Sequence, residues 1–115
     1  MYRFSYAEIL DESATLNRER ERLALDQAVN LLTLAAKAEP GSCEVLAAVA
    51  YLQKLWGCFI TDLADANNEL PRELRATLAS LGLWVIQECD RLISGTGGDI
   101  PMLIDVNIAI RDGLK

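Results

Sequence analysis

The feature that most constrains the fold is a long apolar stretch over residues 42–66, SCEVLAAVAYLQKLWGCFITDLADA. Its large apolar side chains recur at intervals of four and three residues. This spacing puts them on one side of a helix, because each residue advances about 100° around the axis. They are Val45, Val49, Leu52, Trp56, Phe59 and Leu63. Leu46, Leu55 and Ile60 widen the arc, so the stretch predicts an interior, central helix.

The opposite side of this predicted helix is small rather than polar. Ala47, Ala50 and Gly57 lie there, and side chains this small allow a second backbone to approach closely. The sequence therefore predicts that another element packs on this side as well.

Three further amphipathic segments accompany the central helix. Ser13 or Thr15 is a suitable cap for a helix that ends near Pro40-Gly41. A third helix is predicted over residues 71–93, before the stop signal SGTGG, and a fourth over residues 99–113. Four helices with short connections predict one all-α domain over residues 1–115, an antiparallel up-down bundle.

The N-terminal residues carry a different pattern. Tyr2, Phe4 and Tyr6 alternate with Arg3 and Ser5, and a period of two is typical of extended chain. We expect an extended N-terminal arm that lays its aromatic face on the bundle, followed by a short helical turn over residues 7–10.

Charge and composition favour some partners over others. The chain has 17 acidic and 11 basic residues and a net charge of -6, which disfavours direct contact with nucleic acid or anionic membranes. Charge-free runs such as residues 76–87 are shorter than the ~20 residues that cross a bilayer, so no membrane insertion is expected. The opening residues lack the pattern of a signal peptide, and the three cysteines form no CxxC pair. A cytoplasmic protein with reduced thiols is the expectation.

The residues that usually carry enzymatic chemistry are scarce. The chain has no histidine, which removes the commonest general base and transition-metal ligand. Cys43, Cys58 and Cys89 are expected to be small core residues, and the acidic pairs are expected to be solvated. We therefore expect a non-enzymatic protein with no cofactor and no metal.

Four apolar residues lie off the predicted core stripes: Leu83, Ile86, Ile104 and Ile108. They either pack on a further element of the chain or form a surface for a protein partner. If the third and fourth helices are neighbours, these residues join into one strip. Tyr2, Phe4 and Tyr6 of the arm are candidates to cover that strip in the free protein.

Several segments together resemble the FlaF family of flagellar biosynthesis regulators from alphaproteobacteria. They are MYRFSYAEIL, RERERLAL, LWGCFITDLA, NNELPRELRATLASLGLWVI and LIDV…IRDGL, and they span nearly the whole chain. The resemblance implies a non-enzymatic protein needed for flagellin production and secretion, with flagellin as partner and a chaperone-like role. The alternative is a regulatory adaptor that controls flagellin synthesis through a FlbT-like regulator.

Overall fold

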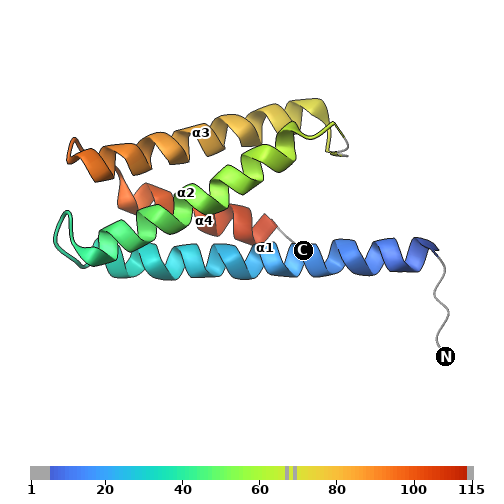
Figure 1. Ribbon diagram of the computed structural model, residues 1–115, viewed down its shortest axis with the longest axis horizontal. Coiled ribbons are helices and arrows are strands. Elements are labelled where there is room, and N and C mark those ends of the chain that lie inside the picture. Colours follow the sequence, from blue (N-terminus) through green and yellow to red (C-terminus); the bar gives the residue numbers. More distant parts are fainter. Residues whose placement is uncertain (1–5, 67, 69, 114–115) are drawn as a thin grey trace.

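The computed structural model describes the backbone of residues 6–66, 68 and 70–113, and the side chains within those ranges from residue 18 onward. These residues form four helices and no strand: α1 (Tyr6–Ala36), α2 (Cys43–Ala64), α3 (Arg72–Ser94) and α4 (Ile100–Gly113). Successive helices run in opposite directions (Figure 1). The predicted all-α, up-down arrangement is confirmed.

The helix ends follow the local signals in the sequence. The Ser42 hydroxyl accepts a hydrogen bond from the Val45 amide at 3.4 Å, so Ser42 caps α2. Gly95 ends α3 in the left-handed conformation, with φ of 74°. The Asp99 carboxylate accepts a bond from the Met102 amide at 3.0 Å and caps the start of α4. Capping residues beside each helix end therefore determine these boundaries.

The turn between α3 and α4 is held against the end of α3. The Glu88 carboxylate, which is buried, accepts a hydrogen bond from the Asp99 amide at 3.3 Å. Gly98 has φ of +107°, and a Cβ there would lie 2.5 Å from Leu92 Cγ. Only glycine fits this conformation and space, and the tight turn lets α4 fold back into the bundle.

The core lies where the four helices meet. α1 packs on both α2 and α4, while α2 also packs on α3. The buried apolar residues of the core come from every helix: Leu25, Ala28, Leu32, Ala35, Val45, Ala48, Val49, Leu52, Trp56, Val85, Cys89 and Leu103. The predicted stripe around Trp56 is confirmed for its first four members, whereas Phe59 and Leu63 are only half buried.

The expected start of α1 was wrong. The helix begins at Tyr6 and continues through Ser13 and Thr15, so neither caps it, and the short turn expected over residues 7–10 is part of α1. Tyr2 and Phe4 lie outside the described residues, as does the side chain of Tyr6. The first turns of α1 project beyond the other helices (Figure 1).

The expected neighbour on the small side of α2 was also wrong. Ala47 and Ala50 are exposed, and a Cβ added to Gly57 would meet no atom within 4 Å. α1 and α3 flank α2 and α4 lies behind it (Figure 1), so no described helix covers this side. The pattern shows which residues share a face, but it does not show whether a neighbour lies there.

By length and composition, α2 is the one described helix that could cross a membrane. The core helix of a soluble protein meets the same criterion, and five residues of α2 are buried in the bundle. Lys54 lies exposed near its middle, where a bilayer span would place a charge in hydrocarbon at a cost of ~2.5–3.5 kcal/mol.

Candidate protein-binding groove

Parts of the predicted core stripes remain uncovered at one end of the bundle. Leu74 and Leu78 belong to the apolar stripe of α3, but Leu74 is 44% exposed and Leu78 is half buried. Figure 1 shows that α4 ends before it reaches the far end of α3, so α4 does not cover this part of the stripe. The stripes of α2 and α3 therefore border an open groove here.

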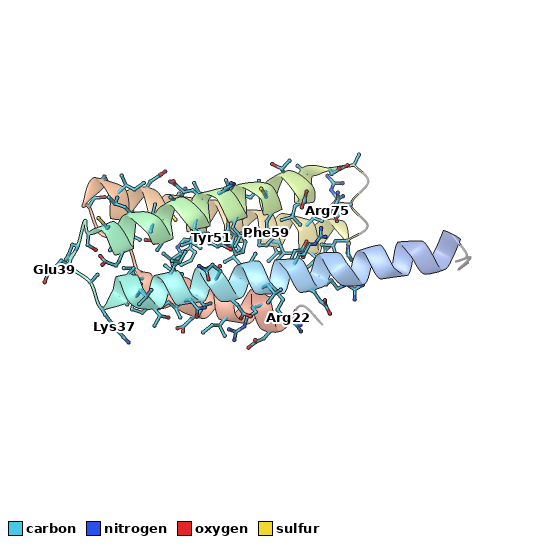
Figure 2. All side chains as sticks on the ribbon, turned by 60° about the horizontal axis from the view of Figure 1, so that its bottom comes forward. Arg22, Lys37, Glu39, Tyr51, Phe59 and Arg75 are labelled. Carbon is cyan, nitrogen blue, oxygen red and sulfur yellow. The ribbon has the colours of Figure 1, made fainter. Side chains whose placement is uncertain are left out.

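The groove has a volume of about 170 Å³, and all four helices contribute to it. Its walls are apolar: Trp56, Phe59, Leu63, Leu70, Leu78 and Ile110. Its polar rim consists of Glu21 on α1, Asp62 on α2 and Asn68 in the following loop. Figure 2 shows Phe59 pointing from α2 toward α1. We refer to this feature as the groove.

A hydrogen-bonded pair fixes the floor of the groove. The Trp56 indole N–H donates to Asn107 Oδ1 at 2.9 Å, and Asn107 Nδ2 donates to the Leu103 carbonyl at 2.7 Å. Trp56 also meets Phe59 edge to face, with ring centroids 5.3 Å apart. Sequence reasoning missed Asn107, although its spacing from Leu103 and Ile110 puts it on the inner face of α4.

The rim of the groove is acidic. Burial raises the pKa of Glu21, the negative charge of Asp62 raises it further, and Arg18 partly opposes these effects. Among the described residues that line the groove, none is basic. Asn68 accepts a hydrogen bond from the Leu70 amide at 3.0 Å, which holds Leu70 at the rim. The site therefore combines apolar walls with two carboxylates.

The four apolar residues that lie off the predicted core stripes do not form one strip. Leu83 is 55% exposed, whereas Ile86 and Ile104 pack against the core. Ile104 and Ile108 share a face of α4 with Arg111, which bonds Asp26 of α1 at 3.0 Å. The two isoleucines therefore face α1, because α4 packs on α1 rather than on α3.

The cysteines divide into two groups. Cys89 is buried as predicted, and burial with the charges of Asp90 and Glu88 raises its pKa to about 12. Cys43 and Cys58 are exposed, so the expectation that they belong to the core was wrong. Both lie on the side of α2 that no described helix covers. Within the part of the chain that the structure describes, no acidic or thiol cluster could hold a metal ion.

Comparison with known proteins adds one finding. The family model for the flagellar protein FlaF matches residues 2–114, which is nearly the whole chain. Searches of curated proteins and of solved structures found no match. Because the family match covers all four helices and the groove, the chain belongs to the FlaF family of flagellar proteins.

Proposed function

We propose that this flagellar protein binds flagellin in the groove and assists flagellin production and secretion as a chaperone-like regulator. Membership of the FlaF family supports the flagellar context, and the resemblance described above supplies flagellin as the partner. The groove supplies a way to bind it, because an amphipathic helix can lay its apolar face into a hydrophobic groove.

The observation that carries the proposal is the uncovered core stripe of α3. Leu78 of that stripe lines the groove half buried, and Leu70, which precedes α3, lines it with 41% of its surface exposed. Apolar area removed from water stabilises a complex by about 25 cal/mol per Å². A partner helix placed beyond the end of α4 would cover these residues. It would occupy the part of the bundle that α4 does not reach.

Paired substitutions test this proposal. Leu70→Asp places a charge in the groove, whereas Leu83→Asp places one on an exposed position outside it. Binding of purified flagellin monomer is measured by calorimetry, and thermal melting confirms that each variant is folded. The groove variant is expected to bind at least ~10-fold more weakly, since 1.4 kcal/mol corresponds to tenfold, while Leu83→Asp binds as the wild type does.

Two results would contradict the groove as the flagellin site. A folded groove variant with unchanged affinity removes it. Loss of binding in Leu83→Asp instead moves the site to the outer face of α3, where the sequence predicts a partner surface.

Co-purification from motile cells separates the proposed function from regulation through an adaptor. Flagellin in the eluate supports the chaperone-like role, whereas a FlbT-like regulator without flagellin supports the adaptor. We expect binding in the cytoplasm, before flagellin is secreted. With 17 acidic against 11 basic residues, direct binding of flagellin messenger RNA is not expected.

A further inference from the structure

We infer that the groove selects its helix by charge as well as by apolar area: the occupant carries a Lys or Arg beside its apolar face, placed to meet Glu21 and Asp62. This inference rests on the proposed function of the groove and names the chemistry of the helix it takes. The cationic side chain fixes the register of the helix, whereas the apolar walls supply most of its affinity.

The first support is the position of the two carboxylates. Glu21 comes from α1 and Asp62 from α2, and both line the groove beside Phe59 and Leu63. A purely apolar occupant would remove their water without replacing it, and desolvating an uncompensated charge is costly. An ammonium or guanidinium group at the same place forms charge-assisted hydrogen bonds instead.

The second support is that no basic residue is among the described residues that line the groove. Arg18 lies one turn before Glu21 on α1 and lowers its pKa, but burial and Asp62 act more strongly in the opposite direction. The pKa of Glu21 therefore stays above its ordinary value. A cation brought by a partner would be attracted by both carboxylates at once.

A second copy of this chain fits less well as the occupant. Its net charge is -6, so it would bring like charge to an acidic rim.

Two synthetic peptides test the inference without assuming flagellin. Both are amphipathic helices with the same Leu face, and they differ only in two Lys or two Gln residues beside that face. Their affinities are measured by fluorescence anisotropy at 0.15 M salt. The wild type is expected to prefer the Lys peptide at least ~10-fold, because hydrogen bonds to charged groups contribute ~1.5–3 kcal/mol.

Two matched variants distinguish an effect of the rim carboxylates from an effect of the protein's net charge. Glu21→Gln with Asp62→Asn removes two charges from the groove. Glu39→Gln with Glu44→Gln removes two charges where α1 turns into α2, at the opposite end of the bundle (Figure 2). The preference for the Lys peptide is expected to disappear in the first variant and to persist in the second.

Several outcomes would overturn the inference. These are no preference in the wild type, an equal preference in the rim variant, or no binding of either peptide. Light scattering that shows a dimer which the Lys peptide does not dissociate would identify a second copy as the occupant. If the Lys peptide binds as expected but flagellin does not, the proposed function fails and the charge selection stands.

Discussion

Replacing Asn107 by Ala perturbs the contact that fixes the floor of the groove. Both partners are inaccessible to solvent, since Asn107 is 0% and Trp56 is 1% exposed. The substitution removes the acceptor for the indole N–H and leaves that donor buried without a partner. We expect most of the lost stability to come from the unpaired indole N–H, and less of it from lost packing.

The magnitude follows from two contributions. An unsatisfied buried donor costs roughly 1–3 kcal/mol, and the small cavity adds roughly 0.5–1 kcal/mol at ~24 cal/mol per Å³. The total of about 1.5–4 kcal/mol corresponds to a fall in melting temperature of roughly 6–16 °C for a domain of this size. Asn107→Leu leaves no cavity but leaves the same donor unpaired, so a cost of roughly 1–3 kcal/mol is expected to remain.

The assay is thermal unfolding followed by circular dichroism, with a double-mutant cycle. Trp56→Phe removes the donor and Asn107→Leu removes the acceptor, so the double variant leaves neither group unpaired. It is expected to be more stable than the sum of the single effects predicts, by ~1 kcal/mol or more. Additive effects, or an Asn107→Ala variant within ~0.5 kcal/mol of wild type, would refute this account of the groove floor.

Three further predictions concern single positions. Gly98→Ala should lower the free energy of unfolding by at least ~1 kcal/mol, because the turn leaves no space for a Cβ and its positive φ disfavours a side chain. Gly57→Ala, at a helical position where a Cβ meets no other atom, should raise it by ~0.5–1 kcal/mol. Urea unfolding of both variants measures the two changes. Iodoacetamide at mildly alkaline pH should label exposed Cys58 in the folded protein and Cys89 only after unfolding, as mass spectrometry would show. Because the pKa of Glu21 is raised in the fold, its stabilising contribution is present at low pH and is lost as pH rises through that pKa. Glu21→Gln should therefore melt above wild type at neutral pH and match it in acid; an equal difference at every pH would contradict this.

The sequence predicts the local features of this fold well. The stripe through Trp56, the cap at Ser42 and the left-handed stop at Gly95 depend on residues close to one another in the chain. Such signals do not require knowledge of what a helix packs against. For the same reason four helices and their order can be read from the sequence.

The groove could not be predicted in this way, because it depends on which helices pair. The short connection between α3 and α4 suggests that they are packed neighbours, yet α4 packs on α1. That pairing turns Ile108 toward α1 and leaves Leu78 beside an open groove. A periodic pattern identifies a face, but only the tertiary arrangement decides whether the face is covered.

The most direct test of the central claim is photo-crosslinking in motile cells. A benzophenone amino acid replaces Leu70, which lines the groove, or Leu83, which lies outside it and is similarly exposed. After irradiation, tagged protein is purified and its adducts are identified by mass spectrometry. The account predicts a flagellin adduct from position 70 and none from position 83. A flagellin adduct from position 83 alone, or none from position 70, would contradict it.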